Sequence, residues 1–274
     1  MSEELQKKLD QLHHQLAQYT SAVIAFSGGV DSTYLAAVTG DRLNGHVLLV
    51  TATSATYPAS ELDEAKALAG SLNLAHRVIV SEEIEIPGFS DNPPDRCYYC
   101  KSELFSKITA IARAEGYDIV CDGSNADDLQ DFRPGRRAIC EQKVISPLLD
   151  AGLTKNEIRA LSAQRGLATA VKGSFACLAS RFPYGETIDR EKLKRVGTAE
   201  AAVRALGFVQ VRVRSHGNLA RIEFAPDELQ RGWTMKDSVD RCCREAGFIF
   251  VAIDTRGYRT GAMNEALPDS ITAS

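Results

Sequence analysis

The residues whose types and spacing best suit chemistry form a short loop, Ser27-Gly28-Gly29-Val30-Asp31-Ser32. Its adjacent glycines allow backbone amides to face an anion with no side chain in the way. A helix that begins at Asp31 would direct its unpaired N–H groups and the positive end of its dipole at the same point. The loop has no Walker lysine, so γ-phosphoryl transfer is not its chemistry. It predicts a nucleotide phosphate site; the alternative is a generic glycine turn capped by Asp31 and Ser32.

An acidic segment, Asp122-Gly123-Ser124-Asn125-Ala126-Asp127-Asp128 followed by Asp131, comes after a later predicted strand. A nucleoside triphosphate needs Mg²⁺, which takes hard oxygen ligands and usually one or two carboxylates. Asp31 or Asp127 is the predicted magnesium ligand, and Gly123 is expected beside the nucleotide. The alternative is a polar turn in which an aspartate caps a helix.

Cysteine spacing suggests a second kind of chemistry. The chain has seven cysteines and no export signal, so a disulfide framework is not expected. Cys97-Tyr98-Tyr99-Cys100 supplies the close pair that one edge of an iron–sulfur cluster needs, although half a zinc site or a redox dithiol has the same spacing. Zinc is disfavoured, since there is no second C-x-x-C and no nearby histidine. Burial is the expected role of four others: Cys121, Cys140, Cys242 and Cys243.

The scaffold predicted by the hydrophobic pattern is an α/β fold. Short apolar strands alternate with amphipathic helices over the first 164 or so residues. Strands joined by helical crossovers form a parallel, doubly wound sheet, which binds ligands at the ends of its strands. The expected strands are 22–26, 46–51, 77–80, 118–121 and 144–148, and the expected helices are 5–16, 31–38, 61–72, 101–115 and 155–164.

The pattern changes near Gly185, where a small C-terminal α+β domain is expected. Its predicted elements are helices 191–206 and 236–246 and strands 209–214, 220–224 and 248–254. The chain would then consist of a nucleotide domain, 1–184, and a substrate or oligomerisation domain, 185–274. Arg212 and Arg214 share one face of a strand, because side chains alternate with period two. A solvated sheet face and a phosphate clamp both explain them.

Composition limits the classes of function. Of 274 residues, 44% are apolar and 25% charged, the balance of a globular protein that can bury its own core. The net charge is −4 and the isoelectric point is near 5.8, so no global basic field attracts nucleic acid. No apolar run approaches the roughly 18 residues of a membrane span, and no signal segment is seen. We expect a cytoplasmic enzyme with no membrane or nucleic-acid partner.

The glycine loop resembles the PP-loop of the ATP pyrophosphatases, which cleave ATP at its α-phosphate. Further segments extend the resemblance over residues 20–264, and together they closely resemble the LarE-type ATP-dependent sulfur transferases. These segments are 54–58 with Glu61, 92–101, 133–137, 146–148 and 176–185. The set is far more specific than the glycine loop alone.

The resemblance implies a step in the synthesis of the nickel-pincer nucleotide cofactor of lactate racemase and related enzymes. ATP would adenylate a carboxylate of pyridinium-3,5-biscarboxylic acid mononucleotide and release pyrophosphate. Sulfur would then displace AMP and leave a thiocarboxylate. The resemblance makes Cys177 the sulfur-bearing cysteine and suggests that Ser180 and Arg181 orient the activated carboxylate or its phosphate. It adds Ser54 to the nucleotide site and assigns the substrate phosphate to Arg212, Arg214 and Glu200. For Glu200 the alternative is a residue on an exposed helix surface.

The resemblance also bears on the source of sulfur. Some family members give up the sulfur of the single cysteine, and others bind a 4Fe–4S cluster that delivers sulfide. Here Cys97, Cys100 and Cys177 would supply three thiolates and leave one iron free for sulfide. We expect the cluster, with sacrifice of the Cys177 sulfur as the alternative. Because family members assemble into multimers, a homo-oligomer is also expected.

Three other functions remain open. A PP-loop tRNA thiolase should carry a basic domain or arm, and this chain is acidic. A glutamine-fed amide synthetase needs an amidotransferase nucleophile, for which the N-terminal helix leaves no room, so an ammonia-using synthetase is the version to test. A nucleotide-binding regulatory module without chemistry would release no pyrophosphate from ATP.

Overall fold

The computed structural model describes residues 2–129, 134–173, 176–259 and 261–268. The chain divides into two compact units, unit 1 (Met1–Glu83 with Asp95–Ser174) and unit 2 (Ile84–Pro94 with Phe175–Ser274). The short segment 84–94 belongs to unit 2 because it bonds to that unit's own backbone. The Asn92 side-chain amide donates to the carbonyl of Pro183 at 2.7 Å, and the Ile188 N–H donates to the carbonyl of Ser90 at 2.8 Å. The functional boundary at 184/185 stays a prediction.

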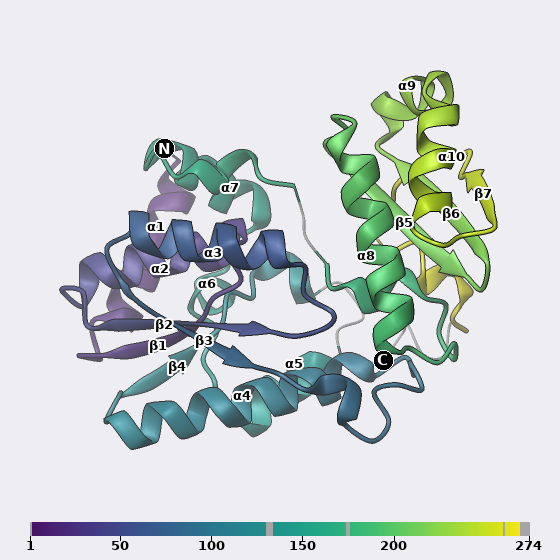
Figure 1. Ribbon diagram of the computed structural model, residues 1–274. Helices are drawn as coiled ribbons and strands as arrows, with labels where there is room; N and C mark the ends of the chain where they lie inside the picture. The colour runs from purple at the N-terminus through teal and green to yellow at the C-terminus, as the bar shows by residue number, and fades with distance from the viewer. Residues whose placement is uncertain (1, 130–133, 174–175, 260, 269–274) are drawn as a thin grey trace. The chain divides into compact units, whose positions relative to one another are not determined.

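Unit 1 has the predicted α/β fold, with a four-stranded parallel sheet in the order β3-β2-β1-β4 (Figure 1). Its helices and strands are α1 Glu3–Leu16, β1 Ala22–Ala25, α2 Val30–Arg42, β2 Val47–Thr53, α3 Ala59–Ser71, β3 Ala75–Val80, α4 Arg96–Glu115, β4 Ile119–Cys121, α5 Gly135–Glu141, α6 Pro147–Asp150 and α7 Lys155–Gln164.

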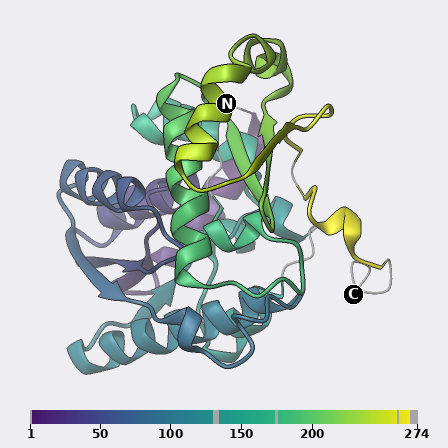
Figure 2. The ribbon, with the colours of Figure 1, turned by 45° about the vertical axis from the view of Figure 1, so that its right-hand side comes forward.

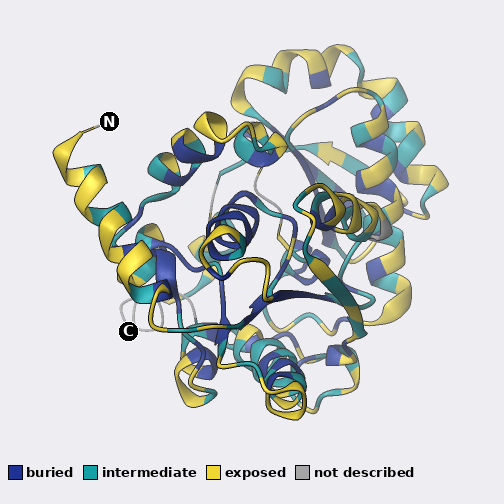
Figure 3. Ribbon diagram, turned by 90° about the vertical axis from the view of Figure 1, so that its left-hand side faces the viewer, coloured by how far each residue is buried: buried dark blue, intermediate teal, exposed yellow. Residues whose placement is uncertain are grey.

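The central strands of the unit 1 sheet are buried on both faces, because their successive side chains enter two different cores, whereas the edge strand β3 is partly exposed. Ile24 packs with residues of α1, α2 and α7, whereas its neighbour Val23 packs with residues of α4. Figure 1 shows α1, α2, α3 and α7 on one side of the sheet and α4 and α5 on the other. Helix α1 is exposed along most of its length, and its buried residues are Leu12 and Leu16 (Figure 3).

The strand order places the expected site at a topological switch point. From β1 the chain proceeds outward through β2 and β3, and β4 then pairs with the opposite edge of β1. Ile24 lies beside Cys121 in the register of that pair. The loops that follow β1 and β4 therefore begin side by side at the carboxyl end of the sheet, where doubly wound folds bind ligands.

The predicted strand at 144–148 is wrong. Ile145 alone forms a bridge, with Cys121, and helix α6 begins at Pro147. Proline has no N–H for a sheet ladder, and its fixed φ suits the first position of a helix. Helix α4 also begins five residues before the expected Lys101, so Cys97 and Cys100 are helical.

Unit 2 contains a three-stranded sheet in the order β5-β6-β7, antiparallel between β5 and β6 and parallel between β6 and β7. Its helices and strands are α8 Arg190–Ala205, β5 Val211–His216, β6 Leu219–Phe224, α9 Leu229–Thr234, α10 Lys236–Glu245 and β7 Phe250–Ile253. Helices α8 and α10 pack against each other and against the sheet (Figure 2). No helix in the described part of either unit is both long and apolar enough to serve as a membrane span.

Candidate active site

The glycine loop joins β1 directly to α2. Gly28 has φ +67°, and a Cβ at this position would lie 3.1 Å from the Cα of Ala65 in α3, so both conformation and space require glycine. The hydroxyls of Ser27 and Ser32 lie 3.1 Å apart and close the loop. Gly29 occupies the N-cap of α2 and offers no side chain to its first amides. These amides are therefore available to an anion.

Asp31 stands at the second position of α2 and forms an ion pair with Lys155, the first residue of α7. Burial raises the pKa of the Asp31 carboxyl, and the charge of Lys155 opposes this effect. Among the described residues, Asp31 Oδ1 is buried without a hydrogen-bond partner. An unpartnered buried carboxylate oxygen suits a hard cation such as Mg²⁺, which needs only one or two carboxylates when phosphates supply the rest.

Lys155 was not expected from the sequence as a site residue. A lysine at the start of a helix is unfavourable, because its positive charge lies at the positive end of the helix dipole. This unfavourable placement was the only sign in the sequence that Lys155 could belong to a site. The capping box of Thr154 and Glu157 fixes this helix start, and Lys8 contacts Glu157 at 2.8 Å. The Lys155 ammonium is thereby held beside the glycine loop.

The loop after β4 contacts the glycine loop as the strand order predicts. A Cβ on Gly123 would lie 3.1 Å from the backbone nitrogen of Ser32, so the two loops pack backbone to backbone. Asp127 accepts a hydrogen bond from the backbone N–H of Lys155 at 3.0 Å. This contact agrees with the helix-cap alternative for Asp127 and makes Asp31 the better-placed magnesium ligand. Asp131 and Arg133 lie outside the described residues.

Ser54 belongs to a hydroxyl cluster around Glu83, which is 2% exposed. Glu83 accepts hydrogen bonds from Ser54 (2.5 Å), Thr56 (2.5 Å) and Ser81 (2.8 Å). These bonds satisfy the buried carboxylate and fix the 54–57 loop beside the glycine loop. The Ser54 hydroxyl proton is thus committed to Glu83, which the sequence analysis missed because Glu83 is 29 residues away.

The cysteine pair lies in the first turn of α4. Cys97 is exposed and Cys100 is partly exposed, and neither forms a disulfide. A Cβ on Gly135 would lie 3.2 Å from the carbonyl oxygen of Cys97, so α5 packs closely on this turn. In the described part of the chain, no three side chains from His, Cys, Asp or Glu are grouped as a metal site.

Four cysteines were expected to be buried. Cys121 and Cys243 are fully buried, as predicted, and burial raises the pKa of both thiols. The prediction is wrong for Cys140, which is exposed, and Cys242 is only partly buried. Both cysteines lie on helices, and adjacent residues of a helix can fall on its buried face or on its exposed face.

Cys177 in unit 2 precedes a 3₁₀ turn, Leu178–Arg181, that Arg181 holds together. The Arg181 guanidinium is 0% exposed, and it donates to the carbonyls of Ala176 (2.9 Å) and Cys177 (3.3 Å) and to the hydroxyl of Ser180 (2.7 Å). Its remaining donors contact Glu200 at 2.9 and 2.6 Å. Arg181 is therefore fully engaged in fixing the backbone around Cys177.

Glu200 is 2% exposed, so exposed helix surface is the wrong interpretation of this residue. Besides Arg181, Arg204 donates to it at 3.1 Å, and Arg212 lies 4.0 Å away. Burial on its own would raise the pKa of Glu200, but the hydrogen bonds and charge of Arg181 and the charge of Arg212 hold it below the ordinary value. Among the described residues, three arginines therefore surround this one buried carboxylate.

Arg212 and Arg214 are also buried, at 3% and 5% exposure, so a solvated sheet face is wrong for them. Burial and the nearby charge of Arg181 lower the pKa of Arg212 to about 10. Arg214 is neutralised by Glu223 at 2.7 Å and donates to the Ser180 carbonyl at 2.9 Å. Both arginines therefore contact a buried carboxylate and a backbone carbonyl within unit 2.

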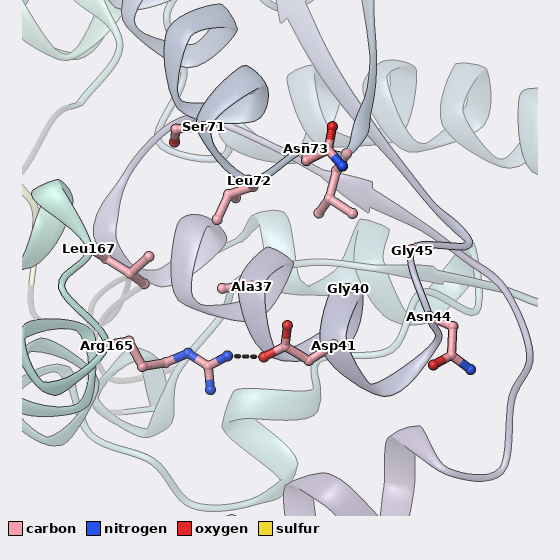
Figure 4. Close-up of a pocket in the computed structure, with 11 residues that line it drawn as sticks. Ala37, Gly40, Asp41, Asn44, Gly45, Ser71, Leu72, Asn73, Arg165 and Leu167 are labelled. Carbon is pink, nitrogen blue, oxygen red and sulfur yellow. Dashed lines mark hydrogen bonds and ion pairs between the residues drawn. The ribbon is translucent and has the colours of Figure 1, made fainter.

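A separate hollow of about 460 Å³ lies near the amino ends of strands β2 and β3 in unit 1 (Figure 4). It is lined by the ends of α2, α3 and α7, and an ion pair between Asp41 and Arg165 crosses one side. It contains none of the expected site residues. Within unit 1, the glycine loop and the loop after β4 lie instead at the carboxyl end of the strands, where doubly wound sheets bind ligands.

A parallel sheet with a glycine loop at its switch point defines an ATP-dependent enzyme of the PP-loop class. In agreement, a family model described as asparagine synthase matches residues 5–127. The chain is also 35% identical over 245 residues to pyridinium-3,5-bisthiocarboxylic acid mononucleotide synthase of Lactiplantibacillus plantarum, covering 89% of each chain. The chain belongs to the LarE family of ATP-dependent sulfur transferases.

Two further relatives cover nearly the whole chain. An uncharacterized protein, slr1717, of Synechocystis is 42% identical over 267 residues, which are 96% of this chain and 99% of the relative. An uncharacterized protein, MJ0830, of Methanocaldococcus jannaschii is 31% identical over 257 residues, 93% of this chain and 98% of the relative.

Proposed function

We propose that the protein adenylates a carboxylate of pyridinium-3,5-biscarboxylic acid mononucleotide and converts it to a thiocarboxylate. The Lactiplantibacillus relative is named for a product with two thiocarboxylic groups, which supports this substrate. A carboxylate oxygen would attack the α-phosphorus of ATP, and the bond to pyrophosphate would break. Sulfur would then add to the carbonyl carbon, and AMP would leave with the oxygen. Adenylation is needed because a free carboxylate is a poor electrophile.

The observation that carries the proposal is the glycine loop at the switch point of the sheet. Its amides, with those of the first turn of α2, would bind the ATP phosphates, and Lys155 would add positive charge beside them. Asp31 would hold Mg²⁺ through its unpartnered oxygen. The bound ion would neutralise charge on the phosphates.

We further propose that Arg212 and Glu200 form the substrate-phosphate site together with Arg214, and that Ser180 and Arg181 position Cys177. Three arginines gathered around one buried carboxylate, Glu200, support an anion site here. A phosphate would bring further negative charge to these guanidinium groups, and the arginine fork matches its geometry.

The sulfur source proposed here is a 4Fe–4S cluster bound by Cys97, Cys100 and Cys177. The first two fit one cluster edge, because residues three apart on a helix share a face and the helix N-terminus favours thiolates. Cys177 enters by resemblance to the family. The cluster would supply sulfide from its fourth iron. Sacrifice of the Cys177 sulfur is the alternative.

Two assays test these proposals. The activation step requires AMP and pyrophosphate from ATP with the dicarboxylate substrate, and Asp31→Ala should abolish both; ADP and orthophosphate would contradict it. For the sulfur source, anaerobically purified protein should contain iron that is lost in Cys97→Ala, Cys100→Ala and Cys177→Ala but retained in the control Cys140→Ala. Iron-free protein that loses the elements of H₂S at Cys177 during turnover would establish the sacrificial route.

An ammonia-using amide synthetase is the second candidate, because the asparagine synthase model matches the nucleotide-binding part of the chain. Replacing the sulfur source with ammonia would then yield an amide instead of a thiocarboxylate. Homo-oligomerisation is a further proposal, which light scattering of the purified protein tests directly.

A further inference from the structure

The carbonyl groups from Phe26 to Gly29 all have donors, and three of these come from distant parts of unit 1. Phe26 accepts from the Thr51 hydroxyl (2.7 Å) and Gly29 from the Thr33 N–H (3.0 Å). The carbonyl of Ser27 accepts from the Tyr57 hydroxyl at 2.9 Å, and the carbonyl of Gly28 from the Lys172 ammonium at 3.2 Å. Carbonyl oxygens repel phosphate, so a loop that binds an anion must turn them away.

Fixing these carbonyls also fixes the amides. In a trans peptide the C=O and the following N–H point in opposite directions, and none of the described peptide bonds is cis. Holding the Ser27 carbonyl outward therefore directs the Gly28 N–H into the loop. Holding the Gly28 carbonyl likewise fixes the Gly29 N–H, which donates to the Ser27 hydroxyl oxygen at 3.3 Å. Glycine is the most permissive residue and has no side chain to hold such an orientation itself.

Lys172 and Tyr57 are suited to this work. The Lys172 ammonium, on a side chain 14% exposed, has three N–H donors and contacts three acceptors: Gly28 O, Glu61 at 2.9 Å and Glu64 at 2.9 Å. Burial and the two nearby carboxylates raise the pKa of Tyr57, so its hydroxyl remains protonated and can donate.

We propose that Tyr57 and Lys172 are positioning residues that hold the glycine loop in its phosphate-binding orientation. Glu61 and Glu64 keep the ammonium on the Gly28 carbonyl, so Lys172 acts through the backbone and does not contact the phosphate. This inference rests on the proposed use of the loop for ATP. It adds residues of the β2–α3 loop and of the chain after α7 to the nucleotide site.

The test compares ATP with a ligand that has only phosphates and a ligand that has only the nucleoside. Calorimetry would measure ATP, pyrophosphate and adenosine binding to the wild type, Tyr57→Phe, Lys172→Met and Lys172→Arg. We expect Tyr57→Phe and Lys172→Met each to weaken ATP and pyrophosphate about tenfold, the value of one hydrogen bond of ~1.4 kcal/mol. Adenosine binding should stay unchanged, and Lys172→Arg should recover part of the loss.

Two controls separate positioning from general effects of charge or stability. Lys66→Met removes a lysine that is 51% exposed on α3 and should change no affinity. Glu64→Gln removes negative charge while Glu61 still holds Lys172, so it should not weaken ATP. Tyr57→Phe keeps the ring and its packing, so it reports on the loop even if a Lys172 variant fails to fold.

Unchanged ATP and pyrophosphate affinities in Tyr57→Phe and Lys172→Met would overturn the inference. So would an equal loss of adenosine binding, which would indicate general disruption of unit 1. A wild-type protein that binds no ATP would instead contradict the proposed function itself, whatever the variants do.

Discussion

Replacing Glu200 by glutamine tests whether a buried ion pair holds the segment that carries Cys177. Arg181 is 0% exposed and meets the two oxygens of Glu200 at 2.9 and 2.6 Å. Removing one charge from a buried pair leaves the other uncompensated and costs about 3–5 kcal/mol. Two further arginines at this carboxylate, Arg204 and Arg212, add repulsion when it becomes neutral. We therefore expect a free-energy loss within this range.

A loss of about 3 kcal/mol lowers the melting temperature by roughly 6–12 °C in a protein of this size class. Thermal unfolding measures this shift, and the rate of Cys177 alkylation reports on the turn itself. Because Arg181 also bonds the carbonyls of Ala176 and Cys177, loosening it should make the thiol react faster. The matched control is Glu245→Gln, an exposed glutamate of α10, whose effect should stay within about 0.5 kcal/mol.

The double variant Arg181→Met/Glu200→Met should lose less stability than either single variant, because both buried charges leave together. If Glu200→Gln has the melting temperature of the wild type and the rate of Cys177 alkylation is unchanged, the ion pair between Arg181 and Glu200 does not hold the turn, and the reasoning is refuted.

Three further predictions follow from other contacts. Gly28→Ala should abolish ATP binding and destabilise the protein by more than the ~1–2 kcal/mol of a left-handed alanine, because its Cβ also contacts Ala65. The control is Gly45→Ala, at φ +81° with open space around it, which should show only that smaller cost. Equal losses of stability in the two variants would argue against the close contact. Glu83→Ala should cost about 2–4 kcal/mol in urea unfolding, since the hydroxyls of Ser54 and Thr56 lose their carboxylate acceptor while Ser81 keeps Glu103. Wild-type stability would mean that other contacts hold the 54–57 loop. The stabilising effect of the Glu200 charge should be complete above its unfolded pKa of about 4.3 and disappear as pH falls through its lower folded value, because its pKa is depressed on folding. A stability difference between wild type and Glu200→Gln that grows as the pH falls would contradict this sign.

Much of unit 1 is predictable because its signals are local. Apolar runs such as 22–26 and their glycine or proline boundaries identify strands, and i, i+3, i+4 spacing identifies helices such as α1 and α7. Gly123, expected beside the nucleotide, lies against the glycine loop in the structure, and its role in nucleotide binding stays a prediction. Short elements such as α6 have too few residues to show a hydrophobic periodicity. This is why residues 144–148 were assigned to a strand.

The sequence by itself determined the α/β class, the glycine loop and, through its motifs, membership of the LarE family. Only the tertiary structure decided which polar residues are buried. A period of two places Arg212 and Arg214 on one face but does not say whether that face is solvated, and both prove to be buried. Lys155 and Lys172 reach the glycine loop from 124 and 144 residues away. Such contacts depend on how elements pack, and no local pattern encodes that.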